Sequence, residues 1–306
     1  MIGLYIVLGV VGLLLILMFS SLFFLYKQIF YTPHKGQNND LRLAGLNYQG
    51  HKEEAIALIK NLQTIEYEEI AIKSFDHLKL AGYLYEIKDS KKVAIMCHGF
   101  RGTPRRDFSG GAIEMMKLGM NVILIDERGH GKSDGHSITF GVREQKDVLS
   151  WIDYVKRRFG NDIEIVLVGI SMGGATVLFA SNKVDSNIKI IADCPYSTPK
   201  EIICETIKKL KLSPKFFYPI VNLTSILFAH TNLNNASAFE SVRESQSKIL
   251  IIHGDVDTIV PYTLSQKIYI ENKDKIQYEL FPDAEHGISY LIDPKRYRKI
   301  IKEFLH

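Results

Sequence analysis

A serine between two glycines, where an apolar run meets a helical pattern, is the residue in this chain best suited to covalent chemistry. Ser171 lies in the sequence GISMG, which begins at Gly169. The preceding run, Ile165–Val168, predicts a strand buried on both faces, and Ala175–Ala180 predicts a helix. Strand, sharp turn and helix in this order are typical of a nucleophile elbow, in which glycines let strand and helix pass closely. Ser171 is therefore predicted to be a nucleophile at a helix N-terminus, where the dipole favours negative charge.

A serine hydroxyl needs a base to take its proton, and the base needs a carboxylate to hold it. Two later loops supply these groups in the order acid, then base. A predicted strand ends at Gly254 and is followed by Asp255 and Asp257, while His286 comes just after the last predicted strand. Open α/β sheets place their chemistry at the carboxyl ends of their strands. We therefore expect Ser171 and His286 to meet there with one of these two aspartates.

Acyl transfer also needs two backbone N–H groups aimed at the oxyanion, one following the nucleophile and one from the loop after an earlier strand. Met172 follows Ser171, and Phe100 belongs to the sequence HGF that ends an earlier predicted strand. Met172 and Phe100 are therefore the predicted oxyanion hole. His98 is predicted to organise this loop rather than to act as the base. The chain has no H-E-x-x-H or similar ligand spacing, so neither a catalytic metal nor a cofactor is expected.

The elements that must position these residues form an alternating pattern. Two period-two stretches predict an antiparallel pair of strands, and the apolar runs that follow alternate with helical patterns, which predicts a mostly parallel sheet with helices on both faces. The predicted strands are residues 68–74, 78–87, 91–99, Asn121–Asp126, Ile165–Val168, Ile188–Ala192, Lys248–Gly254 and Ile276–Phe281. Predicted helices besides Ala175–Ala180 include Ile113–Leu118, Val142–Phe159 and Tyr297–Leu305.

Taken together, the spaced motifs resemble the α/β-hydrolase superfamily, most of all its serine esterase, lipase and acyl-aminopeptidase-like branch. They are HGF from His98, DERGHGKSD from Asp126, GISMG from Gly169, HGDVDTIVP from His253 and AEHG from Ala284. The resemblance runs from about Glu68 to the C-terminus. It implies an eight-stranded α/β-hydrolase fold with a small helical cap, Ser171 as nucleophile and His286 as base.

The same resemblance bears on the acid. In the family's H-G-x-x-D pattern the acid is the third residue after the glycine, which is Asp257 here, and Asp255 is then a turn residue. Asp193, at the end of the strand after the elbow, is a minor alternative. The D-x-R-G-x-G-x-S stretch is structural in the family, so Asp126 and Arg128 are expected to hold a loop beside the pocket.

The N-terminal stretch Ile2–Tyr26 is almost wholly apolar and long enough to span a bilayer as a helix. It lacks the charged start, the short apolar region and the cleavage site of a secretory signal. Lysines and arginines follow it and none precedes it, which predicts a cytoplasmic catalytic domain, and three cysteines without C-x-x-C spacing fit a reducing compartment. We expect a single-pass membrane protein. The net charge of +4 comes from dispersed basic residues, which argues against nucleic-acid binding.

Three parts are expected along the chain: an anchor at 1–27, a polar linker with a short amphipathic helix at 28–66, and the hydrolase domain at 67–306. No strand pattern occurs between Asp193 and Ser247, and so long a connection predicts an inserted cap at about 197–246.

Within this cap, the apolar piece Lys215–Phe228 is too short to span a membrane. We expect it to line an acyl pocket and to bring the site close to the bilayer. The alternative is that its side chains only pack the cap onto the sheet. The amphipathic pattern at Lys52–Leu62 is expected to reflect ordinary packing.

The leading functional hypothesis is a serine hydrolase that cleaves an ester or thioester acyl bond of a small molecule or lipid through an acyl-enzyme. A serine peptidase or amidase of the same fold is the alternative within enzymes. A non-catalytic, hydrolase-like binding protein is the alternative from another class, and the complete set of candidate catalytic residues argues against it.

Overall fold

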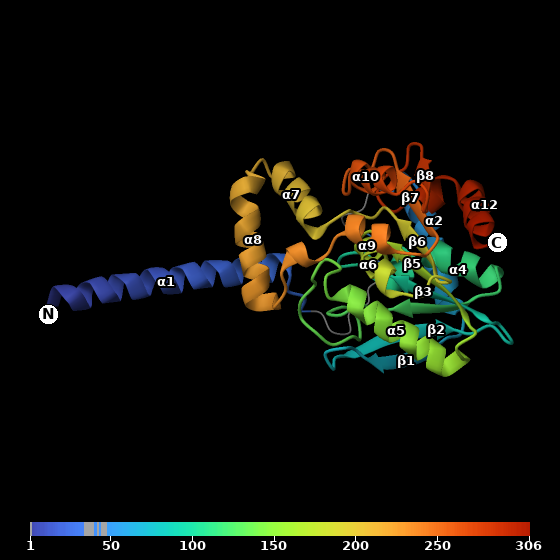
Figure 1. The fold of residues 1–306 in the computed structure, drawn as a ribbon, viewed down its shortest axis with the longest axis horizontal. Coiled ribbons are helices and arrows are strands. Elements are labelled where there is room, and N and C mark those ends of the chain that lie inside the picture. Colours follow the sequence, from blue (N-terminus) through green and yellow to red (C-terminus); the bar gives the residue numbers. More distant parts are fainter. Residues whose placement is uncertain (1, 34–39, 42, 44–47) are drawn as a thin grey trace.

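The computed structural model describes residues 2–33, 40, 41, 43 and 48–306, and the remaining residues of the predicted linker lie outside this description (Figure 1). The strands are β1 (Glu68–Lys73), β2 (Lys79–Tyr85), β3 (Lys92–Cys97), β4 (Asn121–Ile125), β5 (Glu164–Ile170), β6 (Lys189–Asp193), β7 (Ile249–Gly254) and β8 (Ile276–Phe281). The helices are α1 (Ile2–Ile29), α2 (Lys52–Thr64), α3 (Pro104–Asp107), α4 (Ser109–Lys117), α5 (Glu144–Phe159), α6 (Met172–Ala180), α7 (Pro199–Lys209), α8 (Pro214–Ala229), α9 (Ala238–Glu244), α10 (Thr263–Glu271), α11 (Ser289–Ile292) and α12 (Pro294–Leu305), with short 3-10 turns η1 (Ser181–Lys183) and η2 (Leu233–Asn235).

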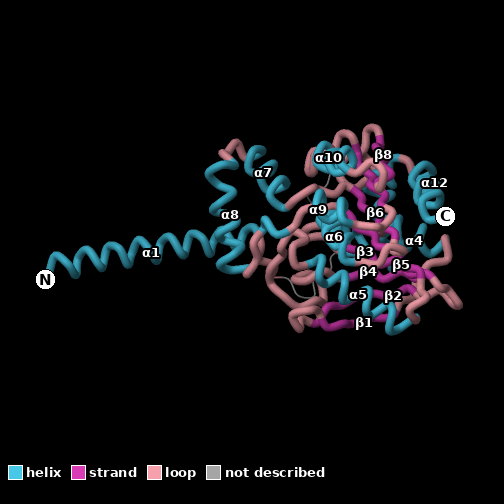
Figure 2. The backbone as a smooth tube through the Cα atoms, in the orientation of Figure 1, coloured by secondary structure: helices cyan, strands magenta, loops and turns pink. Residues whose placement is uncertain are grey.

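The eight strands form one sheet in the order β1-β2-β4-β3-β5-β6-β7-β8 (Figure 2). β1 pairs antiparallel with β2, and β2 pairs antiparallel with β4, whereas every other pair is parallel. This is the eight-stranded, mostly parallel sheet predicted from the sequence. The parallel strands bring the ends of β3, β5, β6, β7 and β8 to one edge, where the candidate site residues follow them.

The central strands are buried on both faces because alternate residues point to opposite sides of a strand. On β3, Val93, Ile95 and Cys97 belong to one apolar core. Ala94 and Met96 belong to a second core on the other face. Helices α5, α6 and α9 contribute to the first core, while α4 and α12 contribute to the second. A continuous apolar run in the sequence therefore packs against helices on both faces of the sheet.

The N-terminal helix α1 projects from the rest of the molecule as a long rod (Figure 1). Within α1, a stretch of 18 or more residues is apolar enough to cross a membrane, and none of that stretch is buried. Its last turn and the residues after it, which begin the predicted polar linker at 28–66, pack on the domain. Phe30 is fully buried, its carbonyl accepts from the Ile138 amide, and the Thr32 amide donates to His136 O.

The predicted insertion at 197–246 contains α7, α8, η2 and α9, and these helices pack against different parts of the molecule. α9 packs against α6 and η1, so it belongs to the helical layer over the sheet. Helices α7 and α8 pack against each other, and α8 also packs against α1 (Figure 1). The part of the insertion that stands away from the sheet is therefore α7 and α8.

The loop after β4 is held by a buried ion pair. The guanidinium of Arg128 makes two hydrogen bonds to the Asp147 carboxylate, of 2.6 and 2.7 Å, and two more of 3.1 Å to Asp76. Asp126 accepts from the Tyr83 hydroxyl and from the Lys132 amide. Both residues hold the loop, as the resemblance implied.

Replacing Arg128 by Leu should lower the free energy of unfolding by about 3–5 kcal/mol, because it leaves the buried Asp147 carboxylate without its partner. Arg158 offers a matched control, since its guanidinium also makes two hydrogen bonds to one carboxylate, that of Glu68, but at the surface. Exposed pairs contribute about 0–1 kcal/mol, so Arg158→Leu should change stability little. Denaturant unfolding of both variants measures the difference, and equal losses would contradict it.

Candidate active site

Ser171 sits in a strained turn that only glycine neighbours permit. Its φ of 55° and ψ of −116° lie in a region that residues with a side chain seldom adopt. A Cβ atom at Gly169 would lie 2.1 Å from the Gly173 carbonyl oxygen, and one at Gly173 would lie 1.8 Å from the carbonyl oxygen of Cys97. Both glycines are therefore sterically required, and the turn has the geometry of a nucleophile elbow.

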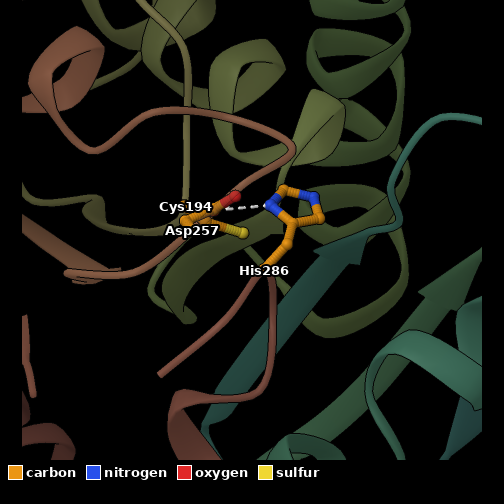
Figure 3. Close-up of side chains that lie close together, drawn as sticks. All are labelled: Cys194, Asp257 and His286. Atoms are coloured by element: carbon orange, nitrogen blue, oxygen red, sulfur yellow. Dashed lines mark hydrogen bonds and ion pairs between the residues drawn. The ribbon is translucent and has the colours of Figure 1, made fainter. Parts of the chain in front are cut away.

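The three residues predicted to form a triad lie within hydrogen-bond distance of one another. The Ser171 Oγ atom is 2.9 Å from Nε2 of His286. Nδ1 of the same imidazole is 2.7 Å from Oδ2 of Asp257, the contact drawn in Figure 3. His286 and Asp257 are buried, whereas Ser171 is partly exposed to the cavity. This arrangement allows His286 to accept the serine proton while Asp257 holds the imidazole.

Several hydrogen bonds keep the Asp257 carboxylate ionised. Its Oδ1 accepts from the amides of Ile259 and Val260, and its Oδ2 lies 3.2 Å from Nε2 of His253. Burial alone raises the pKa of Asp257, but hydrogen bonds to His253 and His286 outweigh it and hold this pKa well below its usual range. Asp257 is therefore suited to stabilise a protonated imidazole.

The two rival aspartates have other partners. Oδ1 of Asp255 accepts from the Asp283 amide at 2.7 Å, which makes Asp255 a turn residue. Oδ2 of Asp193 accepts from the Tyr297 hydroxyl at 3.1 Å. Burial raises the pKa of Asp193 to about 6, against the lowering effects of His253 and of the Tyr297 hydrogen bond. The geometry thus favours Asp257 over both alternatives.

The loop predicted to supply an oxyanion donor passes directly beside Ser171. A Cβ atom at Gly99 would lie 3.3 Å from the Cβ of Ser171, and the Gly99 amide donates to Oδ2 of Asp107 at 2.9 Å. In the described part of the chain, the amides of Phe100 and Met172 donate to no backbone carbonyl. Two amides without a backbone acceptor, on either side of the serine, match what an oxyanion hole requires.

A cavity of about 110 Å³ opens onto Ser171 and His286. Its apolar wall includes Ala55 and Leu58 from α2 and Ile288 and Leu291 from the C-terminal segment. None of its lining residues comes from Lys215–Phe228, so the prediction that this segment lines the pocket is wrong for this cavity. The reason is that α8 packs against α1, whereas α2, which was expected to be ordinary packing, covers the site.

Solved structures of esterases share this fold. The fold superimposes on the Pyrococcus furiosus esterase Pf2001 with a TM-score of 0.65 and 26% sequence identity, over 80% of this chain and 92% of the esterase. The chain belongs to the α/β-hydrolase superfamily. Est1E of Butyrivibrio proteoclasticus, solved with ferulic acid bound, shares the fold with a TM-score of 0.60 and 24% identity, over 77% of this chain and 97% of Est1E.

Comparisons by sequence find a family model and several relatives. Residues 88–220 match the family described as serine aminopeptidase, S33. The uncharacterized protein YqkD of Bacillus subtilis is 24% identical over 81% of this chain and 82% of its own length. A thiohydrolase, aneE of Aspergillus aculeatus, is 28% identical, but the match covers 45% of this chain and 44% of the thiohydrolase. YNL320W of Saccharomyces cerevisiae, named an uncharacterized membrane protein, is 26% identical over 79% of this chain and 80% of its own length.

A cysteine lies beside Asp257 and His286. The Sγ atom of Cys194 and the ligand atoms of Asp257 and His286 all lie within 4.8 Å of one another (Figure 3). Cysteine, aspartate and histidine are metal ligands, but burial raises the pKa of the Cys194 thiol, and Nδ1 of His286 is directed at Asp257. A metal would need the thiolate and a free ring nitrogen, whereas here the thiol is protonated and the ring nitrogen is engaged. We therefore interpret Asp257 and His286 as a hydrogen-bonded pair against which the Cys194 thiol packs.

Sequence reasoning missed two positioning residues. Asp107 holds Gly99 and pairs with Arg106 at 2.7 Å, yet it lies in no motif that would have singled it out. His253 belongs to the HGDVDTIVP motif but has no predicted role in the site, and its Nε2–H donates to the Val260 carbonyl at 2.9 Å. The same nitrogen also faces Asp257. The spacing H-G-D-V-D, which puts a histidine four residues before the acid, was the available signal.

His98 behaves as predicted. Its Nδ1–H donates to the Gly99 carbonyl at 2.8 Å, and its Nε2 accepts from the Glu127 amide at 3.2 Å. Both ring nitrogens are occupied by backbone groups, so His98 is a loop-organising residue.

Proposed function

We propose that this hydrolase cleaves an ester or thioester acyl bond by way of an acyl-enzyme on Ser171. The observation that carries the proposal is the chain of contacts from Ser171 Oγ through the His286 imidazole to the Asp257 carboxylate, at 2.9 and 2.7 Å. Ser171 Oγ attacks the carbonyl carbon while Nε2 of His286 takes the hydroxyl proton. The same proton then goes to the leaving alcohol or thiol.

In the second half of the reaction, a water attacks the acyl-enzyme as His286 takes one of its protons. The bond between the acyl carbon and Ser171 Oγ breaks, and His286 returns the proton to the serine. The amides of Phe100 and Met172 stabilise the oxyanion in both halves. Asp257 stays ionised throughout and stabilises the imidazolium.

A peptidase is the alternative that the serine aminopeptidase description favours. An aminopeptidase must bind the charged amino terminus of its substrate, which calls for a carboxylate in the pocket. The acids lining the cavity are Asp107 and Asp193. Asp107 already pairs with Arg106 and the Gly99 amide, and Asp193 accepts from Tyr297. Oδ1 of Asp193 is buried and has no hydrogen-bond partner among the described residues, so Asp193 is the acid that a peptide terminus would have to reach. The apolar wall nevertheless favours an acyl chain over a peptide terminus.

The test is a matched set of substrates carrying one acyl group as an ester, a thioester and an amide, together with aminoacyl amides. The full chain, held in nanodiscs, should turn over the ester or thioester and leave the amides nearly untouched. Turnover restricted to aminoacyl amides would replace this proposal with the peptidase. Absence of any turnover, with no labelling by a fluorophosphonate probe, would favour a binding protein.

The same assay tests the role of α2. Leu58 lines the cavity, so Leu58→Ala should shift the preferred acyl chain length, with each lost methylene contact worth about 1–3 kcal/mol of discrimination between substrates. A ladder of ester chain lengths measures this shift.

Leu227→Ala is the matched control, because Leu227 is an exposed residue of α8 that does not line the cavity. Its chain-length profile should equal that of the unaltered protein. A shifted profile for Leu227→Ala and an unchanged one for Leu58→Ala would show that the cap, and not α2, forms the acyl pocket.

We also propose that α1 is a membrane anchor. Its length, its exposed apolar surface and the membrane protein among the relatives support this.

A further inference from the structure

Helix α8 lies across α1 at the end where α1 meets the domain (Figure 1). The contact is aromatic and is centred on Phe228. Its ring centroid lies 5.1 Å from that of Phe19, 5.4 Å from Phe23 and 5.5 Å from Tyr26. Edge-to-face and tilted ring pairs at this distance are favourable beyond the area they bury. The position of α8 is therefore tied to about two turns of α1, from Phe19 to Tyr26.

This stretch of α1 spans the bilayer boundary when α1 is inserted. A helix of 28 residues is about 42 Å long, and the hydrocarbon core, about 30 Å thick, takes about 20 of those residues. Counted from Ile2, the hydrocarbon ends close to Ser21, so Phe23, Tyr26 and Lys27 fall among the headgroups. The Lys27 ammonium lies 3.2 Å from the ring centroid of Tyr31, an aromatic and basic pairing that suits an interface. α8 therefore lies at the level of the interface.

α8 carries an apolar stripe that the described residues leave partly exposed. Phe216 is 64% exposed, and Leu223, Ile226 and Leu227 are each more than 40% exposed. At 100° per residue, these four side chains fall on one side of the helix. α8 contains no acidic residue. A helix that presents such a stripe beside a membrane-spanning segment has the character of an interfacial helix.

A basic groove of about 310 Å³ begins where α8 ends. Residues that line it include Phe75, Arg143, Lys146, Lys183, His230 and Asn232, and none of its lining residues is acidic. His230 caps α8 directly after Ala229, two residues beyond Phe228. The groove thus begins beside the end of α8 that contacts α1.

The charge of this groove is only partly neutralised. Arg143 pairs with Asp76, and Lys183 donates to the side-chain oxygen of Gln145 at 2.6 Å. The Lys146 ammonium lies 4.9 Å from the ring centroid of Phe75 and pairs with no carboxylate among the described residues. Lys146 and Lys183 leave the groove with net positive charge, which attracts anions.

We propose that α8 and this groove form a docking surface for the bilayer in which α1 is inserted, with the apolar stripe in the interface and the groove on anionic phospholipid headgroups. The docking would fix the distance and tilt of the hydrolase domain above the membrane. The proposal concerns position and not catalysis, so it holds whatever bond the enzyme cleaves.

The first experiment places a tryptophan on the stripe of the full chain. Leu223→Trp, reconstituted in nanodiscs that contain brominated phospholipid, should be quenched well beyond the shared background from Trp151, which is fully buried. Leu14→Trp in α1 is the control for insertion. Ile270→Trp on α10, 56% exposed and away from α1, is the control for solvent (Figure 1). Quenching of Leu14→Trp with none for Leu223→Trp would overturn docking while leaving the anchor intact.

The second experiment tests the headgroup. Quenching of Leu223→Trp should increase when phosphatidylserine is mixed into the phosphatidylcholine. Adding Lys146→Ala should lower the docking equilibrium about fivefold, since a basic residue near an anionic surface is worth about 1 kcal/mol. Arg157→Ala, at the other end of α5 and exposed, is the matched control and should have no effect.

Two outcomes of this second experiment would reject the proposal. One is an equal response to phosphatidylserine with and without Lys146. The other is that inorganic phosphate, at equal ionic strength in phosphatidylcholine discs, reproduces the effect of phosphatidylserine, because the groove would then be a site for a soluble anion.

Discussion

Replacing Ser171 by Ala should lower turnover by about 10⁶-fold and abolish fluorophosphonate labelling, because removal of a triad nucleophile typically costs that much. The hydroxyl makes its contact with Nε2 of His286, and alanine keeps the backbone of the turn. Thermal stability should therefore change little. Measured hydrolysis rates, probe labelling and melting curves of the full chain give all three results.

Ser265 provides a matched control for this experiment. Its hydroxyl also lies close to an imidazole, 2.7 Å from Nδ1 of His253, but the side chain is fully buried and lines no part of the catalytic cavity. Ser265→Ala should keep its labelling and lose stability instead, by about 1–3 kcal/mol for a buried polar group left unpaired. Labelling that persists in Ser171→Ala, or that disappears in a folded Ser265→Ala, would reject the assignment of the nucleophile.

The sheet was predictable because its signals are local. Buried parallel strands need apolar β-branched runs, and the predicted strands agree with β3, β4, β5 and β7 to within two residues at each end. The elbow was equally recognisable, since Gly169, Ser171 and Gly173 lie within five consecutive residues, although the contact that requires Gly173 is with Cys97 on β3. The contacts between Ser171, His286 and Asp257 link distant parts of the chain. They could be expected only because the ends of parallel strands meet at one edge.

The covering of the site was not predictable in the same way. An amphipathic or apolar helix shows that one of its faces must be covered, but the pattern does not say by which element. Both Lys215–Phe228 and Lys52–Leu62 carry such faces. The first was expected to line the pocket and the second only to pack, but in the structure the second lines the cavity and the first does not. The distinction depends on where each helix docks: α8 docks against α1, and α2 docks against α4.

Asp257→Asn should slow turnover by about 10⁴-fold, the cost of holding an imidazole in the wrong tautomer. Oδ1 of Asp257 is committed to the amides of Ile259 and Val260, which require an acceptor. An asparagine there must place its NH₂ group where Oδ2 stands, facing Nδ1 of His286. An NH₂ group donates, so Nδ1 becomes an acceptor and the proton moves to Nε2. In that tautomer, Nε2 can no longer accept the proton of Ser171.

Asp255 and Asp193, the two alternative acids, provide comparison variants for this experiment. Asp255→Asn removes a carboxylate that accepts from the Asp283 amide, so it should affect the turn and leave turnover within a few-fold of the unaltered enzyme. Asp193→Asn should also be mild, since burial raises the pKa of Asp193 to about 6 and the residue contacts Tyr297 rather than His286. A larger loss for Asp255→Asn than for Asp257→Asn would show that family spacing misassigns the acid. If only Asp193→Asn abolishes turnover, the acid comes from the end of β6, and the contact between Asp257 and His286 is structural.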